Sequence, residues 1–165
     1  MNTSLIVSGL AAVALTICGG LLTEVGPWYR GLRKPSSQPP DWLFGPAWTV
    51  ILGLAAWSAS LGWEAARSPG ERAVVVGLFL VNALFHLLWS PLFFKFRRPD
   101  WALAEVVFLW LSIAALVVWL SPRAPLAAGL LVPYLAWVTF ASWLNLMIVR
   151  LNAPFGSRWV PDQGG

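Results

Sequence analysis

Hydrophobic residues in this chain form five long runs that are separated by polar segments. The runs cover approximately residues 5–22, 43–63, 73–94, 101–120 and 126–149. Each has about the 20 residues that an α-helix needs to cross roughly 30 Å of hydrocarbon. Backbone groups in lipid must be satisfied within the segment, and the alternation over about ten residues that marks a membrane β-strand is absent. The pattern therefore predicts an all-α membrane protein with five transmembrane helices.

Three of the four connections between these runs are short. They read EAARSPGER (64–72), KFRRPD (95–100) and SPRAP (121–125). Short connections make consecutive helices antiparallel, so residues 1–165 are predicted to form a single domain, a compact five-helix bundle. The first connection, residues 24–42, is longer and contains the stretch WYRGLRKPSSQPPDW. Its three cations, three prolines and three aromatic rings distinguish it from a simple linker.

Composition and charge agree with a membrane location. The 165-residue chain is 58% hydrophobic and 11% charged, whereas soluble domains have roughly 25% charged residues. The net charge of +4 does not indicate a nucleic-acid partner, because most cations lie in the short connections beside the membrane. Their bias predicts that the first connection and the C-terminus are cytoplasmic and the N-terminus outside. One side would hold Arg30, Arg33, Lys34, Lys95, Arg97, Arg98, Arg150 and Arg158, and the other Arg67, Arg72 and Arg123.

A bacterial cell membrane is the expected location, with an outer membrane as the alternative. The first hydrophobic run is interpreted as a membrane helix, because no Lys or Arg precedes it as in a cleavable signal.

Tryptophan is abundant, with twelve residues in the chain. Those near predicted helix ends are interpreted as anchors at the membrane–water interface. The others lie deeper, where a large flat ring can hold a large flat apolar ligand. The first group is Trp28, Trp42, Trp63, Trp101, Trp119 and Trp159, and the second is Trp48, Trp57, Trp89, Trp110, Trp137 and Trp143.

Polar residues inside a membrane helix are candidates for function. Asn82, His86 and Trp89 are spaced to share one face of the third helix. Asn82 and His86 could hydrogen-bond a ligand or each other, and the alternative is that they only join helices. No second His and no Cys at ligand spacing completes a metal site, which leaves axial ligation of a haem as the one metal role for His86.

The fourth and fifth helices carry further polar positions. Glu105 lies one turn inside Trp101 and is expected to extend its carboxylate to the interface. Trp137, Ala141 and Asn145 share one face of the fifth helix, and Ala141 would leave a gap beside Trp137 into which a ring could fit. No nucleophile-and-base arrangement and no phosphate loop is present. A binding site is therefore a better inference than hydrolysis or phosphoryl transfer.

Three blocks of the sequence resemble one known family. WYRGLRKPSSQPPDWLFGPAWT (28–49) matches every fixed position of the first-loop signature W-Y-x-x-L-x-K-P-x-x-x-P-P-x-W-x-F-x-x-A-W-T of the translocator proteins, also called tryptophan-rich sensory proteins or peripheral benzodiazepine receptors. LLWSPLFF (87–94) and the segment 132–152 resemble the family's third-helix and fifth-helix signatures. The resemblance spans essentially the whole chain.

This resemblance implies a five-helix bundle, often a homodimer, with a pocket near the cytoplasmic side that the first loop closes. Members bind porphyrins such as protoporphyrin IX, and some bind sterols or isoquinoline-carboxamide ligands; no cofactor is required. Some bacterial members degrade porphyrin with light and oxygen. The pocket residues carried over by motif position are Tyr29, Trp48, Trp137 and Ala141, and Trp89, Pro133, Tyr134 and Asn145 also match.

The chain departs from its relatives at two features. Asn82 and His86 stand where many relatives have Gln and Asn, so the ligand preference at this wall can differ. The sterol-contact pattern sought near the C-terminus fails, because Arg150 lies too far from Tyr134.

The leading functional hypothesis is a receptor that binds a porphyrin-like tetrapyrrole for sensing, sequestration or transport. Its first alternative is a porphyrin-degrading enzyme that uses Trp48, Trp137 and Tyr29, and its second is a transporter or interaction protein without catalysis. Ser58 and Gly62 form a small-residue pair that suggests a dimer face. The first connection is expected to act as a stiff lid, with Arg33, Lys34, Pro35, Pro39, Pro40 and Trp42 contributing charge, rigidity and anchoring.

Overall fold

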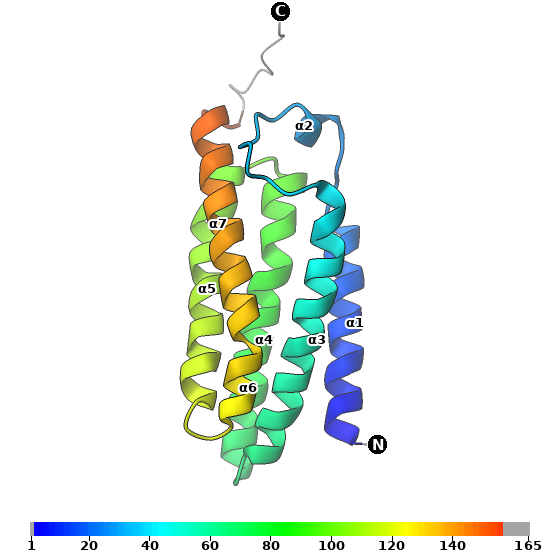
Figure 1. The fold of residues 1–165 in the computed structure, drawn as a ribbon, viewed down its shortest axis with the longest axis vertical. Helices are drawn as coiled ribbons and strands as arrows, with labels where there is room; N and C mark the ends of the chain where they lie inside the picture. Colours follow the sequence, from blue (N-terminus) through cyan, green and yellow to red (C-terminus); the bar gives the residue numbers. More distant parts are fainter. Residues whose placement is uncertain (1, 157–165) are drawn as a thin grey trace, which may run out of the picture.

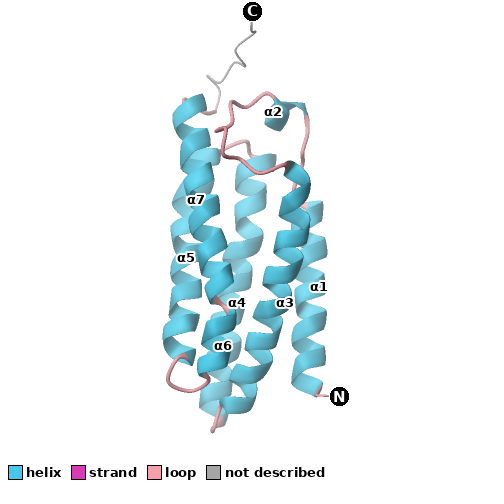
Figure 2. Ribbon diagram, in the orientation of Figure 1, coloured by secondary structure: helices cyan, strands magenta, loops and turns pink. Residues whose placement is uncertain are grey.

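The computed structural model describes residues 2–156 and shows a bundle of long helices whose neighbours along the chain are antiparallel (Figure 1). Five spans are long and apolar enough to cross a membrane. Within the described residues every regular element is a helix and none is a strand (Figure 2). The predicted fold class, an all-α membrane bundle, is therefore confirmed. The elements are α1 (Thr3–Leu21), α2 (Pro27–Arg30), α3 (Asp41–Ala65), α4 (Pro69–Ser90), η1 (Pro91–Lys95), α5 (Pro99–Leu120), α6 (Pro125–Leu130) and α7 (Val132–Asn152).

Proline and capping residues set the helix starts. Proline stands in the first turn of α2, α4, α5, α6 and α7, where a missing N–H costs nothing. At the start of α4, Ser68 Oγ accepts a hydrogen bond from the backbone N–H of Glu71 (3.2 Å), and the Glu71 carboxylate accepts one from the N–H of Arg67 (2.7 Å). These contacts satisfy N–H groups that the helix itself leaves free.

Two predicted helices are interrupted. The third continues from α4 into η1, a wider π-helical turn that begins at Pro91, and the fifth is divided into α6 and α7 just before Pro133. Each proline lacks the N–H that would bond four residues back, so the regular hydrogen-bond ladder loses one bond at that point. The expectation of one unbroken fifth helix over 126–149 is therefore corrected.

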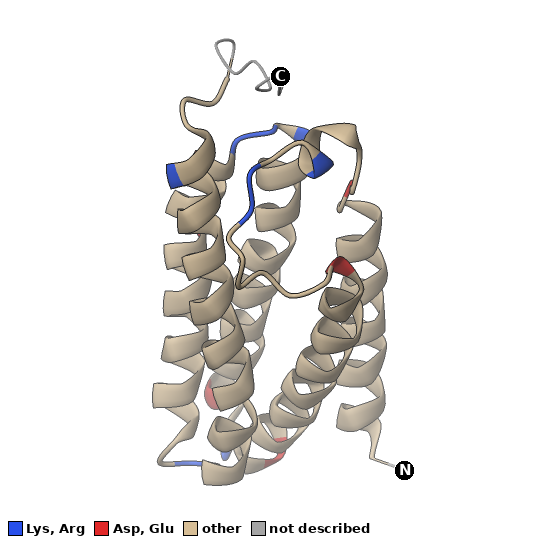
Figure 3. Cartoon of the chain, turned by 45° about the horizontal axis from the view of Figure 1, so that its top comes forward, with Lys and Arg blue, Asp and Glu red and all other residues tan. Residues whose placement is uncertain are grey.

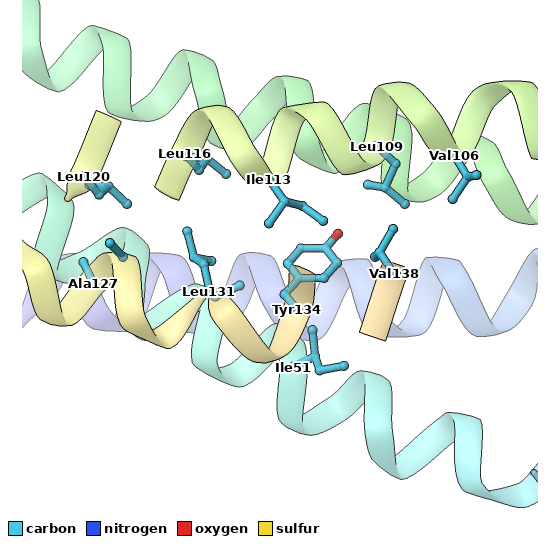
Figure 4. Close-up of a cluster of buried hydrophobic side chains, with 12 residues drawn as sticks. Ile51, Val106, Leu109, Ile113, Leu116, Leu120, Ala127, Leu131, Tyr134 and Val138 are labelled. Carbon is cyan, nitrogen blue, oxygen red and sulfur yellow. The ribbon is translucent and has the colours of Figure 1, made fainter. Parts of the chain in front are cut away.

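The main hydrophobic core lies between α3, α5, α6 and α7. Ile113, Leu131, Tyr134 and Val138 are essentially inaccessible within it, and their side chains converge between the helices (Figure 4). At the end of the bundle near the N-terminus, Ser58 Oγ of α3 donates to the backbone carbonyl of Ala127 in α6 (2.8 Å). α1 stands outside this core, has no buried residue, and packs chiefly against α3.

The structure corrects the suggested dimer face. Ser58 is fully buried, and a Cβ on Gly62 would lie 2.8 Å from the Leu120 side chain. Both residues therefore serve contacts within one chain, where the missing side chain of Gly62 leaves room for the Leu120 side chain of α5.

Glu105 is also placed differently from the expectation. It is 6% exposed, and neither carboxylate oxygen has a hydrogen-bond partner among the described residues. It lies on the same face of α5 as the buried residues Ala102 and Leu109. That face points into the bundle, so the expected extension to the interface is wrong.

Charge separates the two ends of the bundle. Seven cations lie at the end that carries α2 and the first loop, and three lie at the opposite end (Figure 3). Arg158 and Trp159 fall outside the described residues. Which end faces the cytoplasm stays a prediction from this bias. The first group is Arg30, Arg33, Lys34, Lys95, Arg97, Arg98 and Arg150, and the second is Arg67, Arg72 and Arg123.

Candidate ligand pocket

A cavity of about 320 Å³ lies at the loop end of the bundle. Its walls come from α1, α3, α4, η1, α5 and α7, and its roof from the first loop. The volume is at the lower end of the range of roughly 300–1,000 Å³ that is typical of small-molecule sites. The structure brings seven of the eight residues expected to bind ligand to this lining: Tyr29, Trp48, His86, Trp89, Trp137, Ala141 and Asn145.

Aromatic rings at right angles form one wall of the cavity. The Trp48 ring meets His86 at 4.8 Å and Trp137 at 6.4 Å between centroids, with interplanar angles of 71° and 85°. Phe44 meets Trp137 edge-on at 5.7 Å. Edge-to-face pairs at these distances are stable arrangements. The wall therefore presents flat apolar faces in fixed orientations.

A second aromatic group closes the cavity toward the roof. Trp89 and Phe93 stack at 5.0 Å with planes 25° apart, and the Tyr29 ring lies 5.3 Å from that of Phe94. The η1 turn places Phe93 and Phe94 beside the loop, where both are buried. The LLWSPLFF block therefore joins the α4 wall to the roof.

The other deep tryptophans do not line the cavity. Trp57 and Trp143 face outward, with 46% and 41% of their surface exposed, and Trp110 Nε1 donates to Thr139 Oγ1 (2.9 Å). Periodicity alone did not separate these three residues from Trp48, Trp89 and Trp137.

His86 is held from two sides. Its Nδ1 lies 3.3 Å from the Tyr134 hydroxyl, and a Cβ on Gly19 of α1 would lie 3.9 Å from its Nε2. A flat macrocycle coordinated at Nε2 would need the space that α1 occupies. The ring therefore serves here as a polar wall residue, and the arrangement does not fit axial ligation of a haem without movement of α1. Within residues 2–156 no three His, Cys, Asp or Glu side chains gather as a metal site.

Asn82 is the expected ligand residue that the structure leaves outside the lining. It is 6% exposed, and its Nδ2 donates to Ser112 Oγ of α5 at 2.9 Å. This contact joins α4 to α5, which is the alternative role that the sequence left open for Asn82. Asn145 lines the cavity and also contacts the first turn of α5. In the amide orientation that satisfies both groups of that turn, Asn145 donates to the Pro99 carbonyl (3.1 Å) and accepts from the Leu103 N–H (3.0 Å).

A polar network around Tyr29 forms the roof. The Tyr29 hydroxyl donates to Asp41 Oδ1 (3.1 Å) and accepts from Gln38 Nε2 (3.0 Å). Lys34 Nζ lies 3.6 Å from the centre of the Tyr29 ring and 3.9 Å from Asp41 Oδ2. Burial, followed by the nearby Asp41 carboxylate, raises the pKa of Tyr29 to about 12. Burial also lowers the pKa of Lys34, against the opposing effect of Asp41.

The loop is fastened to the last helix at a second point. Asn152 at the end of α7 accepts from the backbone N–H of Arg33 (2.8 Å) and donates to the Arg33 carbonyl (2.8 Å). The amide nitrogen also donates to the Ile148 carbonyl (2.8 Å). One side chain therefore binds both backbone groups of a residue 119 positions away in sequence.

The sequence indicated that the first loop covers the cavity, but it did not indicate which loop residues make the contacts. The expected lid residues Arg33, Lys34, Pro35, Pro39, Pro40 and Trp42 belong to the loop or the start of α3, and none lines the cavity. Gln38 and Asp41 do line it, although nothing in their spacing distinguished them. Asn152 was visible only as part of the fifth-helix block.

Two buried polar atoms of the lining have no hydrogen-bond partner among the described residues. They are Trp137 Nε1, a donor, and Gln38 Oε1, an acceptor. Asp41 can only accept from Gln38, so it fixes which end of the amide faces it and leaves Oε1 turned away. A buried polar atom without a partner costs about 1–3 kcal/mol, which a ligand or a small movement of the roof can recover.

The sequence profile of the TspO/MBR family matches residues 7–151. The chain belongs to the TspO/MBR family. Human translocator protein is 37% identical over 137 residues, which cover 82% of this chain and 81% of its own length. The tryptophan-rich protein TspO of Archaeoglobus fulgidus is 36% identical over 151 residues, covering 90% and 97%. The tryptophan-rich sensory protein of Cereibacter sphaeroides is 35% identical over 153 residues, covering 92% and 94%.

Membership in the TspO/MBR family confirms the resemblance drawn from the three sequence blocks. The similar regions include all five membrane spans in part or whole, since the matched segment begins within α1 and ends within α7. As a TspO/MBR chain, the protein is an integral membrane protein whose first-loop block forms the roof and part of one wall of the cavity and whose other two blocks contribute to its other walls.

Proposed function

We propose that this protein binds a porphyrin-like tetrapyrrole in the cavity beneath the first loop, for sensing, sequestration or transport of that ligand. The observation that carries the proposal is the cavity itself. It is small, roofed, and walled by flat rings in fixed orientations. Sites of this kind suit a flat apolar ligand with few polar groups.

The polar groups of the site support a ligand with acidic substituents. Trp137 Nε1 is a donor without a partner in the described part of the chain, and His86 reaches the lining. Lys34 stands beside Tyr29 at the roof, and the loop end of the bundle carries most of the cations. These charges favour the approach of an anion such as a porphyrin propionate. Sterols and isoquinoline-carboxamides remain competing ligands for the same apolar walls.

Titration with protoporphyrin IX tests the proposal. Purified protein in detergent should give saturable quenching of tryptophan fluorescence and a shift of the porphyrin Soret band. Ala141→Phe places a ring in the cavity and should weaken binding by at least about tenfold, equivalent to 1.4 kcal/mol. Ala115→Phe is the matched control, since Ala115 is exposed on α5 and does not line the cavity.

Two results would contradict the proposal. One is the absence of saturable binding by the wild type. The other is equal loss of binding in Ala141→Phe and Ala115→Phe, which would place the porphyrin on the surface of the bundle. Illumination of the bound complex in oxygen, compared with free porphyrin, shows at the same time whether the protein accelerates bleaching.

A further inference from the structure

A second hollow lies between α3 and α7 on the outer face of the bundle. It is lined by Pro46, Ala47 and Val50 of α3 and by Pro133, Ala136 and Trp137 of α7, among other apolar side chains. Val50 is 62% exposed, and Pro133 and Ala136 are also exposed. Both helices belong to membrane-spanning segments. The groove therefore opens toward the hydrocarbon of the bilayer.

Trp137 is shared by this groove and the ligand cavity. It appears in the lining of both, whereas Phe44, its edge-on partner at 5.7 Å, lines only the cavity. Trp137 therefore stands between the two spaces, and the Phe44 ring packs against it on the cavity side. Side chains of this kind change rotamer far faster than helices separate.

The two boundaries of the cavity are held by different forces. The roof is fastened by hydrogen bonds at Tyr29, Gln38, Asp41 and Asn152. Between α3 and α7, by contrast, residues 2–156 show ring contacts such as Trp48–Trp137 and no side-chain hydrogen bond. Apolar contacts can exchange for equally apolar contacts with lipid or ligand, so this boundary opens at lower cost than the polar roof.

The first turns of α3 also lack one backbone hydrogen bond. Pro46 cannot donate to the carbonyl of Trp42, and Gly45 precedes it. A Cβ on Gly45 would have no atom within 4 Å. Farther along, α3 is tied to α6 through Ser58 and Ala127. The backbone next to Phe44 can therefore adjust more readily than the part of α3 that is held at Ser58.

We propose that the groove between α3 and α7 is a lateral entrance, through which a flat apolar ligand dissolved in the bilayer passes between Phe44 and Trp137 into the cavity. The inference rests on the proposed function, because it assumes that such a ligand binds there. The ligand then comes from the membrane, and the roof acts mainly to retain the bound ligand and to exclude water.

Groove-filling variants test the entrance. Ala47→Phe and Ala136→Phe place rings in the groove at residues that do not line the cavity. Stopped-flow fluorescence with protoporphyrin IX delivered in phosphatidylcholine vesicles, against protein in the same lipid, gives both rate constants. Association and dissociation should each slow by about tenfold, a rise in the barrier of about 1.4 kcal/mol. Their ratio, the equilibrium affinity, should stay unchanged, because a gate alters only the path.

The controls separate the entrance from general damage. Ala115→Phe carries the same substitution on the lipid face of α5 and should keep wild-type rates. A gentler pair acts mainly through the backbone: Gly45→Ala stiffens the first turns of α3 and should slow association and dissociation together, whereas Gly53→Ala, which also has open space around its Cβ, should not. Gly45 also lines the cavity, so a loss of affinity in Gly45→Ala without slower association would report a change of the pocket and not of the entrance. This pair keeps the test decisive if the bulky variants fail to fold.

The outcomes distinguish the two proposals. Slowed rates at constant affinity support the lateral entrance. Unchanged rates in the groove variants, together with faster association in Asn152→Ala, would show that the ligand passes through the roof and would overturn it. Loss of affinity without slower association would make the groove a binding surface, which also overturns it. Absence of saturable binding by the wild type defeats the proposed function and this inference together.

Discussion

At the scale of single residues, Tyr29 is defined by its neighbours in the roof. Its hydroxyl bonds Asp41 and Gln38, and burial followed by the Asp41 carboxylate raises its pKa from 10.0 to about 12. A tyrosine in a detached loop ionises near the ordinary value. The stability that the closed roof draws from Tyr29 is therefore complete below pH 10 and is lost as the pH rises through 12.

This shift predicts the titration of one phenol. The near-ultraviolet phenolate absorbance of the wild type minus that of Tyr29→Phe should have its midpoint near pH 12. Subtraction is needed because the chain has two tyrosines. A midpoint near pH 10 would mean that the Tyr29 hydroxyl is open to water and the roof is not closed as described.

Glu105 offers a second residue-scale prediction. Its carboxylate oxygens are buried and have no hydrogen-bond partner within residues 2–156, which costs about 1–3 kcal/mol. Glu105→Leu should therefore raise the thermal unfolding temperature in detergent by a few degrees, since 1 kcal/mol shifts it by about 2–4 °C for a chain of this size. Circular dichroism measures the change, with Glu105→Gln expected between Leu and the wild type. A clear drop for Leu would show that Glu105 has a stabilising contact.

Helical spacing in the sequence predicted which residues lie on one face, and some of these faces line the cavity. Trp137, Ala141 and Asn145 share a face and all reach the cavity. Asn82 and His86 also share a face, yet Asn82 bonds Ser112 while His86 reaches the lining. Helical spacing fixes which residues point the same way but not which neighbouring helix they meet. The same limit explains Glu105, whose direction depends on where α5 sits.

At the scale of elements, the first loop is a fastened segment. It contains the single turn α2, and Gln38 N–H donates to the Pro35 carbonyl (3.0 Å) in a tight turn. Prolines at 35, 39 and 40 restrict the chain between these points. The strongest long-range attachment is Asn152, which binds both backbone groups of Arg33.

Asn152→Ala should release this attachment. Two lost hydrogen bonds of about 1 kcal/mol each correspond to roughly 10- to 30-fold more frequent opening. Limited trypsin digestion reads this out, since cleavage after Arg30 or Arg33 requires an open loop. Asn152→Asp keeps the acceptor for Arg33 N–H but loses the donor, so its cleavage rate should lie between wild type and Ala. Equal cleavage in all three proteins would show that the loop is held elsewhere.

The sequence predicted which segments are helical but not where they break. Run length sufficed for the five spans, because a helix in lipid has few alternatives. Pro91 and Pro133 lie within the runs predicted as the third and fifth helices, and no break was predicted at either residue. In the structure Pro133 lies at the start of α7, and α6 precedes it as a separate element. Where a proline divides a helix depends on whether neighbouring helices pack on both halves.

At the scale of the whole molecule, the end of the bundle that carries the first loop has more cations than the opposite end (Figure 3). The bias predicts a cytoplasmic first loop. In a Cys18→Ser background, Ser36→Cys in the loop and Ser121→Cys at the opposite end are both exposed. An impermeant thiol reagent applied to intact spheroplasts should label position 121 and spare position 36 until the membrane is opened. The reverse pattern would invert the predicted orientation.

The bond between Asn152 and Arg33 also concerns the order in which the protein is made. A chain inserted into the membrane from its N-terminus has α1, the loop, α3 and α4 in place while α7 is still being synthesised. The residue that holds the loop, Asn152, is the last residue of α7, and α7 is the last helix within residues 2–156. The cavity therefore cannot be roofed until synthesis of the bundle is complete, and an unfinished chain has no closed pocket in which to hold a ligand.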